Sequence, residues 1–552
     1  MQPLLPELNL IKLFAGEEFQ QAFDRIVDCL ESDSDNVELC NLAGICASRL
    51  GNMEVAESFW LRAQALDPQS STICSNLGAL HAAQGNRQKA EEFYYRAVEL
   101  DNASAEMHFN LANFLAGSGS TAVMEKAKAA FLDVIRIMPT HYGAWLNLGN
   151  LLFETGYVSA AHTAYTAAAT YHPQVSGAHV NLGNVALHRD EPVSAAAHFL
   201  TALGIDPELP EAHQGLASAY HRQGDGERAA CHREKGFGDR PVSYLPYRGR
   251  GLPVPLLVLA SSLEGNVPWR FLIDQRLFQA AIVAVECFGR DAKLPEHRLI
   301  LNAIGDADLC RDGLEFAGRL VRTVNSPLIN SPQAVLKTGR LDNAKRLGSL
   351  PGVITPNMAL VSRRELLTKP LSFPVLLRSP GFHGGHYFVR ADDRNALQRA
   401  MTDLPGDSLL MMDVLDSRSE DGFFRKFRVM AIDGVLYPVH LAISRKWKVH
   451  YFSADMTEKH RKEEEAFLND FPACLGAGVV SALHGISDVL GLDYCGMDFA
   501  IDGEGNILLY EANATMTFVP PGSDREWDYK RPAIENALKA AKRMFFERLQ
   551  DS

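Results

Sequence analysis

Small, apolar and aromatic residues recur along the first 236 residues at intervals of 34 to 37 positions. Helix-ending residues mark the period: Pro68, Asn102, Pro139, Pro173 and Pro207. Small residues repeat at an early offset: Gly44, Gly78, Ala112, Gly149 and Gly183. Aromatic residues repeat at a later one: Trp60, Tyr94, Phe131, Tyr165 and Phe199. Small side chains let helices approach closely and the ring fills the space where units stack, so this pattern predicts an array of paired helices.

The period and pattern resemble the tetratricopeptide repeat, with five full copies within residues 1–236 and degenerate capping units at 2–36 and 210–236. The resemblance implies an all-α solenoid whose groove binds a peptide or protein. Asn113, Asn150 and Asn184 occupy equivalent offsets, and an amide both donates and accepts hydrogen bonds, so they are candidates to hold a peptide backbone. The alternative is that these amides bridge adjacent helices within the stack.

Beyond a Gly-, Pro- and Arg-containing linker at 237–252, the helical period gives way to short apolar runs. Runs at 254–260, 280–285 and 298–305 are typical of strands buried on both faces. Helical stretches separate them, which predicts a small α/β domain with a mainly parallel sheet at 253–350. A second α/β portion fills 351–552, so the predicted fold is multidomain: a helical solenoid followed by α/β domains.

Near the C-terminus, two apolar runs at 494–501 and 507–513 flank a turn rich in Asp, Gly and Asn, which predicts a β-hairpin. The hairpin brings Asp498 alongside Glu511 and Asn513. Glu511 and Asn513 are two residues apart on one strand and therefore share a face. Two carboxylates and an amide oxygen are hard ligands suited to Mg²⁺. The alternative is a solvated hairpin with surface carboxylates.

An apolar strand at 373–380 contains Arg378 and runs into a glycine-rich loop with His383, Gly384 and Gly385. Glycines let backbone N–H groups approach phosphate oxygens, and an arginine pairs with phosphate through two hydrogen bonds. By itself such a loop is weak support, because a tight glycine turn needs no ligand. Downstream come an apolar strand at 408–416 and a stretch at 423–441 that carries Arg428.

In this order, the parts resemble the ATP-grasp ligase superfamily over roughly residues 253–545, nearest the branch that ligates amino acids to peptides or proteins. The resemblance implies two sheets that grip ATP, with Mg²⁺ or Mn²⁺ bridging its phosphates. It implies that Asp498, Glu511 and Asn513 hold the metal, while Arg428 contacts the triphosphate or an acyl phosphate. Residues expected around the nucleotide are Arg340, Arg378, His383, Gly384, Gly385, Met412, Asp413 and Leu415, with Asp416 or Glu420 at the ribose.

The implied activity is an ADP-forming, ATP- and Mg²⁺-dependent carboxylate–amine ligase that works through an acyl phosphate and recruits a peptide or protein through its repeats. Arg378 and Arg428 are the expected catalytic cations, and the loop at His383 is the expected lid. Candidates for substrate contact are Ser444, Arg445, Trp447 and His450. The alternative for the basic members of this set is that they solvate an edge strand.

The family usually has lysine where Arg378 and, within about a residue, Arg340 stand, and its hinge usually reads Gln-Glu where this chain has Met412-Asp413. Arginine and lysine differ in geometry, so these departures leave nucleotide binding as the expectation and weaken the case for ligation. Two alternatives follow. One is a non-catalytic repeat scaffold with a regulatory nucleotide-binding domain, and the other is phosphoryl transfer to an alcohol.

Composition narrows the classes of function. The net charge of -13 disfavours a nucleic-acid binder. The nine cysteines are odd in number, lack CxxC spacing and mostly lie in apolar runs, which favours reduced thiols over disulfides or a zinc site. The first residues lack a signal-peptide pattern, and no run approaches the ~18 apolar residues that span a bilayer. A cytoplasmic protein without a membrane partner is therefore expected.

Overall fold

The computed structural model describes residues 18–117, 121–238, 240–249, 251–289, 292–322, 324–382, 387–449, 454–516, 518 and 525–550. The chain divides into two compact units. One comprises Met1–Ala178 and Arg248–Leu252, and the other comprises His179–Tyr247 and Pro253–Ser552. The last repeats therefore form one unit with the α/β region, whereas the sequence placed all of 1–236 in a separate domain.

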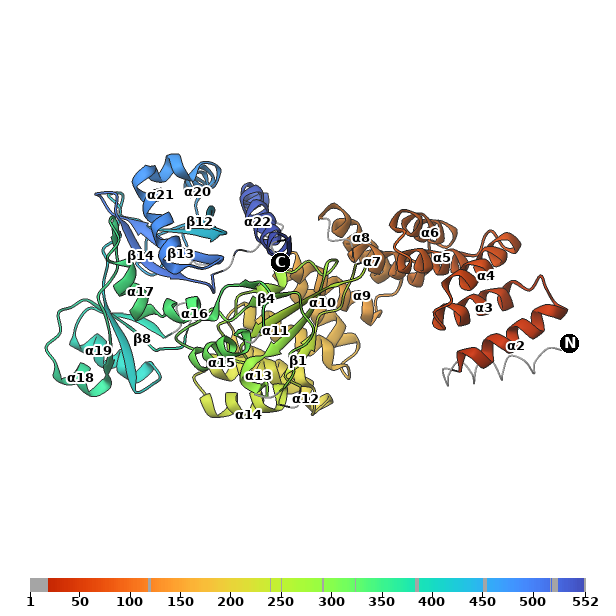
Figure 1. Cartoon of the computed structure of the whole chain (residues 1–552), viewed down its shortest axis with the longest axis horizontal. Helices are drawn as coiled ribbons and strands as arrows, with labels where there is room; N and C mark the ends of the chain where they lie inside the picture. Colours follow the sequence, from red (N-terminus) through yellow and green to blue (C-terminus); the bar gives the residue numbers. More distant parts are fainter. Residues whose placement is uncertain are drawn as a thin grey trace. The chain divides into compact units, whose positions relative to one another are not determined.

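The described N-terminal residues fold into helices that follow one another as antiparallel pairs after α2 (Figure 1). Their bounds are α2 (Phe19–Ser32), α3 (Val37–Arg49), α4 (Met53–Leu66), α5 (Ser71–Ala83), α6 (Arg87–Leu100), α7 (Ala105–Ala116), α8 (Thr121–Ile137), α9 (Tyr142–Glu154), α10 (Val158–Tyr171), α11 (Ser176–His188), α12 (Pro192–Ile205), α13 (Pro210–Arg222) and α14 (Gly226–Phe237). This confirms the predicted helical solenoid, including a helix pair in the capping segment 210–236.

The repeated glycines lie where the repeated aromatic rings need room. A Cβ added to Gly149 would lie 2.5 Å from the ring of Tyr165, and one added to Gly183 would lie 2.6 Å from the ring of Phe199. Both rings are buried, so these two repeats close around a glycine–aromatic contact, whereas Ala112 takes the glycine position in another repeat. The small and aromatic positions of the sequence pattern are therefore core positions, as predicted.

The α/β region begins with a five-stranded sheet in the order β1-β3-β2-β4-β5. Its strands are β1 (Val242–Tyr244), β2 (Val254–Ala260), β3 (Phe278–Ala284), β4 (Leu299–Asn302) and β5 (Leu328–Ile329). Strands β2 to β5 are parallel, as predicted for 253–350, and β1 pairs antiparallel with β3. Residues 242–244 were expected in a linker; they form a strand because the exposed edge of β3 offers backbone partners to the passing chain.

Two further sheets follow. An antiparallel sheet has the order β7-β10-β8-β9, with β7 (Met358–Ser362), β8 (Val375–Arg378), β9 (Phe388–Ala391) and β10 (Ser408–Asp413). The last sheet has the order β12-β11-β13-β14-β6, with β6 (Val353–Ile354), β11 (Phe424–Ile432), β12 (Val435–Ser444), β13 (Tyr494–Ile501) and β14 (Ile507–Asn513). The predicted hairpin of 494–513 is confirmed, with Asp498 directly opposite Glu511.

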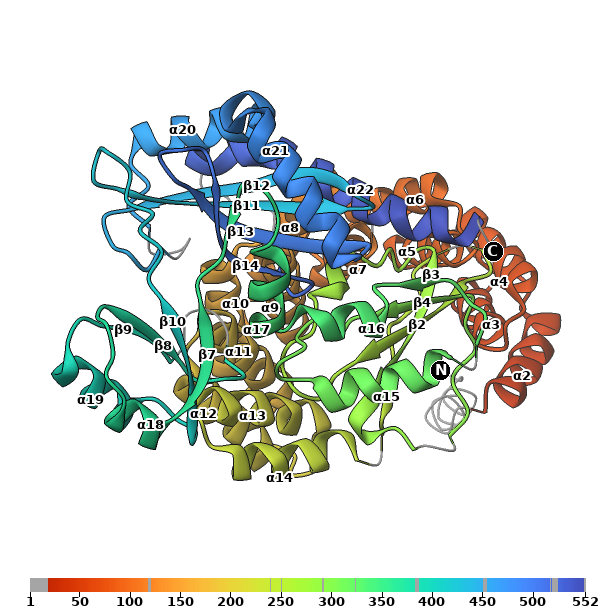
Figure 2. The ribbon, with the colours of Figure 1, turned by 60° about the vertical axis from the view of Figure 1, so that its left-hand side comes forward.

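Helices cover one face of each of these two sheets. Helices α20 (Glu458–Asn469) and α21 (Phe471–Leu490) lie over the last sheet (Figure 2), where Phe467 meets Phe427 of β11 edge to face. Helices α18 (Arg363–Thr368) and α19 (Arg394–Asp403) pack on the four-stranded sheet through Leu366 and Leu397. Helices α15 (Arg311–Val321) and α16 (Pro332–Val335) follow the strands of the first sheet in the chain, and α17 (Arg340–Leu347) packs against β7 and α21. Helix α22 (Arg531–Gln550) contacts β4 of the first sheet and β11 and β12 of the last.

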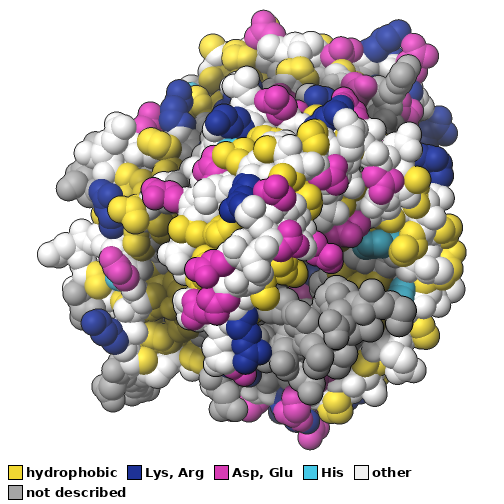
Figure 3. Space-filling model, turned by 90° about the vertical axis from the view of Figure 1, so that its right-hand side faces the viewer, with side chains coloured by type: hydrophobic (Ala, Val, Ile, Leu, Met, Phe, Trp, Pro, Cys, Tyr) yellow, Lys and Arg dark blue, Asp and Glu magenta, His cyan; other side chains and the backbone are white. Residues whose placement is uncertain are grey.

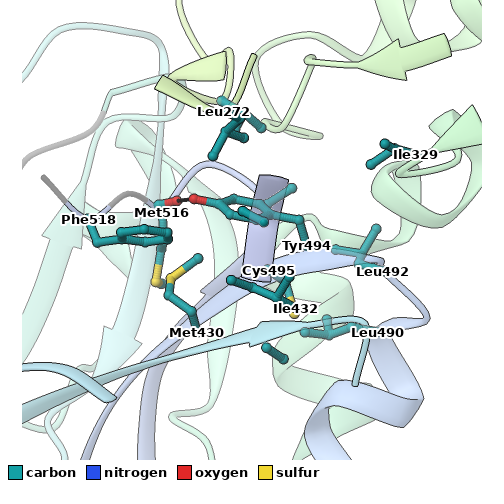
Figure 4. Packing of buried hydrophobic residues seen from close by; sticks show 14 of the residues in the cluster. Leu272, Ile329, Met430, Ile432, Leu490, Leu492, Tyr494, Cys495, Met516 and Phe518 are labelled. Atoms are coloured by element: carbon teal, nitrogen blue, oxygen red, sulfur yellow. Dashed lines mark hydrogen bonds between the residues drawn. The ribbon is translucent and has the colours of Figure 1, made fainter. Parts of the chain in front are cut away.

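The first and last sheets of the α/β region share one hydrophobic core. Figure 4 shows part of this core, where Leu272 lies beside the Tyr494 ring and Ile329 lies on the side of Leu492. The buried Tyr494 hydroxyl donates to the backbone oxygen of Met516 at 3.0 Å, so its one polar atom is satisfied. The shared core holds β13 and its neighbours in a fixed position relative to β2–β5.

Among the described residues, α21 alone is long and apolar enough to cross a membrane by length and composition. The sequence had predicted no such segment. The helix passes because Ala, Val and Leu raise its mean hydropathy although Ser, His and Asp interrupt it. Its Val479, Leu483 and Ile486 are buried, as in the core helix of a soluble protein, which passes the same test. All nine cysteines are free, as predicted.

Candidate functional site

A row of polar residues crosses four strands of the last sheet on one face. His440 of β12 pairs with Arg428 of β11, Arg428 pairs with Asp498 of β13, and Asp498 pairs with Glu511 of β14. Directly opposed residues on neighbouring strands point to the same side, so these four side chains share a face. Residues of the other parity, such as Phe427 and Phe499, are apolar and stack on each other. The sheet thus has an apolar face under α20 and α21 and a face with a charged centre.

Asp498 is the most enclosed carboxylate of this face, with 4% of its surface exposed. Arg428 donates to it through Nε at 2.6 Å and Nη2 at 2.8 Å, and Lys426 Nζ lies 3.1 Å from its Oδ2. Burial alone would raise the pKa of the Asp498 carboxyl, but Arg428 and Lys426 hold that pKa well below its usual value. Asp498 is therefore ionised at neutral pH.

Glu511 and Asn513 complete the predicted ligand set on the same face. Glu511 Oε1 accepts from Arg340 Nη2 at 2.9 Å and from Asn513 Nδ2 at 3.0 Å. The Asn513 Oδ1 atom accepts from the backbone N–H and the hydroxyl of Thr515. Arg340, at the start of α17, also bonds Asp308 at 3.3 Å. The structure brings the three residues together, and each engages protein donors or acceptors.

Arg378 differs from the other cations in its partners. Its guanidinium donates through Nη2 at 2.6 Å and Nε at 3.2 Å to the backbone oxygen of Phe382, and it lies over the Phe388 ring at 5.6 Å. Within the part of the chain that the structure describes, it forms no ion pair. Burial, and then the nearby Arg340, lower the pKa of Arg378 to about 10. A cation held only by a carbonyl and a ring retains capacity for an anion.

Phe388 of β9 also joins the segment after β12 to this site. Trp447 meets the Phe388 ring edge to face at 5.5 Å, and Lys448 Nζ donates to the Phe388 backbone oxygen at 3.3 Å. Burial, and then Arg378, lower the pKa of Lys448. The four-stranded sheet and the last sheet therefore meet around Arg378, and Trp447 of the predicted substrate set lies at this meeting point.

The expected hinge residues lie at the end of β10. Met412 is buried and pairs with Leu376 of β8, while the Asp413 N–H donates to the Asn357 oxygen at 3.1 Å. The Asp413 carboxylate accepts from Asn357 Nδ2 at 2.7 Å. The end of the strand is thus fixed by Asn357, and Leu415 follows it, half-buried.

Of the two expected ribose contacts, Asp416 accepts the backbone N–H of Arg418 at 3.2 Å. Glu420 is exposed. Burial raises the pKa of Tyr510 to about 12; a hydrogen bond with Ser417 lowers it, and the charges of Asp498 and Asp416 raise it. Asp416 itself is exposed.

Ser444 and Arg445 fix the turn that follows β12. Asp455 Oδ2 accepts from the Ser444 hydroxyl at 3.1 Å and from the Arg445 N–H at 2.8 Å. The Arg445 guanidinium lies over the Phe423 ring at 5.4 Å. These contacts are local, and they match the edge-strand alternative more closely than a substrate pocket. His383, Gly384, Gly385 and His450 lie outside the described residues.

The three repeat asparagines have different surroundings. Asn113 Oδ1 accepts from Asn147 Nδ2 at 2.8 Å, and Asn150 Oδ1 accepts from the Tyr165 hydroxyl at 2.8 Å. These bonds match the bridging alternative. Asn184 is exposed. The repeat-array asparagines that link successive repeats also include Asn76, which donates to Asn41 at 2.8 Å.

Sequence reasoning missed three charged residues of this site: Lys426, Asp308 and Lys448. Lys426 was detectable, because it precedes Arg428 by two residues on the same strand and therefore shares its face. Asp308 and Lys448 lie in connecting segments, where no periodicity indicates a direction. Their place in the site depends on long-range packing.

Comparisons with known proteins match the repeats. The tetratricopeptide repeat family matches residues 71–104 and 146–210, so the N-terminal region contains tetratricopeptide repeats. No curated protein matches the chain.

Similar solved structures include the MamA protein, with 21% identity, 30% of this chain and 90% of that chain covered, and a TM-score of 0.28. PilF of Pseudomonas aeruginosa has 16% identity, 38% and 93% coverage, and a TM-score of 0.33. YrrB, described as a TPR protein with an unusual peptide-binding site, has 16% identity, 34% and 95% coverage, and a TM-score of 0.29.

Proposed function

We propose that this protein is an ATP- and Mg²⁺-dependent carboxylate–amine ligase whose repeats recruit a peptide or protein. One observation carries the proposal: Asp498 and Glu511 are directly opposed on neighbouring strands and are ringed by Arg340, Arg428 and Lys426. Such a mixture of carboxylates and cations suits a metal-bound polyphosphate, because the carboxylates attract the metal and the cations attract the phosphates.

The arrangement of cations supports a polyanionic ligand. Three cations act on one another's pKa values. Arg340 lowers the pKa of Arg378, and Arg378 lowers that of Lys448. Gathering like charges is unfavourable unless an anion compensates them. Among the described residues, the guanidinium of Arg378 donates to the backbone oxygen of Phe382, while the carboxylates of Glu511, Asp306 and Asp308 act on it only through their charge. A triphosphate would supply a direct anionic partner.

The donor set fits Mg²⁺ that arrives with a nucleotide. Among the described residues, no group of three or more His, Cys, Asp or Glu side chains is placed to hold a metal. Mg²⁺ commonly binds through one or two carboxylates plus substrate phosphates rather than a complete protein cage. Asp498, Glu511 and Asn513 would hold it here. When bound, the metal neutralises charge on the transferring phosphoryl group.

The sheet arrangement supports the ATP-grasp resemblance. The antiparallel sheet β7-β10-β8-β9 and the mixed sheet β12-β11-β13-β14-β6 meet where Phe388 contacts Trp447. Arg378 comes from the first of these sheets and Asp498 from the second. Two sheets that each supply charged groups to one site agree with the implied grip on ATP. Met412, buried at the end of β10, is the proposed apolar neighbour of the adenine.

In the proposed reaction, a carboxylate oxygen of one substrate attacks the γ-phosphorus of ATP, which releases ADP and leaves an acyl phosphate. An amine then attacks the acyl carbon, the C–O bond to phosphate breaks, and an amide, phosphate and a proton are released. Arg378 and Arg428 stabilise charge on the transferring phosphoryl group and orient it. The enzyme needs to contribute positioning and charge compensation, which are the properties of this face.

The repeats are proposed to present the peptide or protein partner, the role that tetratricopeptide repeats suggest. Figure 3 shows side chains of both charges, Asp and Glu as well as Lys and Arg, interspersed with hydrophobic ones on the face at the right-hand side of Figure 1. In α2, the exposed residues include Asp24, Asp28 and Glu31 together with Arg25.

A scaffold without catalysis is the second candidate, and one observation favours it. Both oxygens of Asp498 are already bonded to Arg428 and Lys426, so the carboxylate is neutralised without a metal. A domain that binds nucleotide without catalysis could keep Asp498 paired with Arg428 and Lys426. Ligation requires that Arg428 and Lys426 turn toward phosphates when a nucleotide binds.

The experiment that separates these functions is turnover by the full-length protein with MgATP and a panel of peptides. Ligation predicts release of ADP and phosphate together with a mass gain on one peptide equal to the mass of its new amide partner less one water. A stable phosphorylated product would instead indicate transfer to an alcohol. Nucleotide binding without turnover of any substrate would favour the scaffold. Asp498→Asn is expected to abolish turnover, while Asp392→Asn, in an exposed pair with Arg390, is expected to retain it.

A further inference from the structure

The end of helix α13, in the last repeat pair, contacts the loop that follows β8. The His221 ring stacks on the Phe382 ring with a centroid distance of 5.3 Å and an interplanar angle of 10°. His221 Nε2 lies 3.3 Å from the backbone oxygen of Gly381 and donates to it in the tautomer that carries a proton on that nitrogen. One side chain of the repeat therefore holds two consecutive residues of the loop.

A second contact holds the other end of the same loop. The Tyr387 hydroxyl donates to the backbone oxygen of Arg222 at 3.3 Å, and the Tyr387 ring meets Phe382 edge to face at 4.6 Å. Arg222 itself is anchored, because it bonds Glu264 at 2.7 Å and the backbone oxygen of Leu187 at 2.7 Å. The last turn of α13 thus forms a fixed base under both Phe382 and Tyr387.

Phe382 connects this base to the charged face. Its backbone oxygen accepts both hydrogen bonds of the Arg378 guanidinium, at 2.6 and 3.2 Å. The Ser379 N–H donates to the Tyr387 oxygen at 3.0 Å, so the strand that carries Arg378 is tied to Tyr387 as well. A displacement of Phe382 would therefore displace the acceptor that sets the direction of Arg378.

We propose that His221 and Arg222 are positioning residues of the nucleotide site, acting through Phe382 and Tyr387 on Arg378. The last repeat pair is then part of the site and not only a recruitment module. This inference rests on the proposed function for its link to nucleotide. It agrees with the division of the chain, in which residues 179–247 belong to the same compact unit as the α/β region.

Partner binding to the repeats and nucleotide binding near Arg378 are expected to be coupled in both directions. A partner that binds the repeats and moves the end of α13 would change the affinity for nucleotide, and by linkage the nucleotide would change the affinity for that partner by the same factor. Binding of a partner to the repeats would in this way change the nucleotide affinity of the site that contains Arg378.

The test combines His221→Ala and Arg378→Ala in a double-mutant cycle, read out as the Kd for MgATP in the full chain. We expect His221→Ala to raise the Kd about 5- to 20-fold in the wild-type background, within the range typical of coupled sites. In the Arg378→Ala background it should have no further effect, since a residue that acts through Arg378 loses its influence when Arg378 is absent. A purely structural role would give additive losses. Such additivity, or an unchanged Kd for the single variant, would overturn the inference.

His81 provides a matched control, because it also stacks on a phenylalanine, Phe93, at 5.4 Å, but lies in the other unit. His81→Ala should leave the Kd unchanged. His221→Phe keeps the stacked ring and should restore most of the affinity. If His221→Phe still has a raised Kd, the role of His221 lies in its hydrogen bond with Gly381, and His221→Gln should then restore the affinity. If neither variant restores the affinity, the inference is refuted.

Hydrogen exchange decides the inference even if the wild-type protein binds no nucleotide. His221→Ala should speed exchange of the backbone amides of Ser379, Gly381 and Phe382 and of residues 387–389, whereas His81→Ala should not. Unchanged exchange of these amides in His221→Ala would refute the positioning role. Absence of MgATP binding by the wild type, with faster exchange in His221→Ala, would refute the proposed function alone.

Discussion

Replacing Asp498 by asparagine removes the charge at the centre of the proposed site while keeping the side-chain shape. Asp498 is 4% exposed and accepts three charge-assisted bonds, two from Arg428 and one from Lys426. Breaking a buried pair on one side costs about 3–5 kcal/mol, because the other charge stays buried. The cationic side chains keep 16% and 20% of their surface exposed, so water compensates them in part. We therefore expect a loss of about 3 kcal/mol, at the lower end of this range.

Calorimetric unfolding of the full-length protein measures this effect, and about 3 kcal/mol corresponds to a drop in Tm of about 4 °C for a unit of this size. Asp392→Asn is the control, since Asp392 pairs with Arg390 at 2.7 Å but is 65% exposed, and exposed pairs contribute little. If Asp498→Asn has the same Tm as Asp392→Asn, Asp498 is not a buried, paired carboxylate.

The same variant has a defined pH dependence. The folded-state pKa of Asp498 lies well below its unfolded value of about 3.9, so its ionisation stabilises the fold fully above that value. This contribution is lost as the pH falls toward the folded-state pKa. The difference in stability between wild type and Asp498→Asn should therefore be constant near neutral pH and shrink below about pH 4. A difference that grows on acidification would contradict this assignment.

Three further outcomes follow from the contacts. Arg378→Ala should weaken MgATP binding at least about 10-fold by titration calorimetry, because charge-assisted bonds contribute roughly 1.5–3 kcal/mol; unchanged affinity would remove Arg378 from the site. Glu464→Gln should cost about 3 kcal/mol in urea unfolding, since fully buried Glu464 pairs with Lys530 at 2.8 Å, and adding Lys530→Met should recover part of the loss. Gly149→Val should destabilise the repeat array in thermal unfolding, whereas Gly204→Val, with no atom within 4 Å of the added Cβ, should be better tolerated.

Local pattern was enough to predict the elements on which the site is built. The apolar runs at 494–501 and 507–513 and the turn between them predicted the hairpin, the pairing of Asp498 with the strand of Glu511, and the shared face of Glu511 and Asn513. The glycine and aromatic offsets likewise predicted the helix pairs. These features depend on residues close in sequence, whose periodicity records which side of an element is buried.

A turn of the same kind was overlooked inside 423–441. Asp433 and Gly434 both have positive φ and join β11 to β12, which places His440 opposite Arg428. The Asp-Gly pair between two apolar runs is a strong hairpin signal, so this element was predictable from the sequence.

Other parts of the site depend on contacts between residues far apart in the chain. Arg340 reaches Glu511 across 171 positions, and His221 reaches Gly381 across 160. No local pattern sets these pairs, because they arise from the packing of one element on another. For the same reason the sequence placed the last repeats with the solenoid, although residues 179–247 pack with the α/β region.

Titration calorimetry of the full-length protein with ATP, in the presence and absence of Mg²⁺, decides whether the charged face of the last sheet binds MgATP. We expect one nucleotide site whose affinity depends on Mg²⁺ and falls in Glu511→Gln and Arg378→Ala. Binding that is absent, or that is unaffected by Mg²⁺ and by both substitutions, would contradict it.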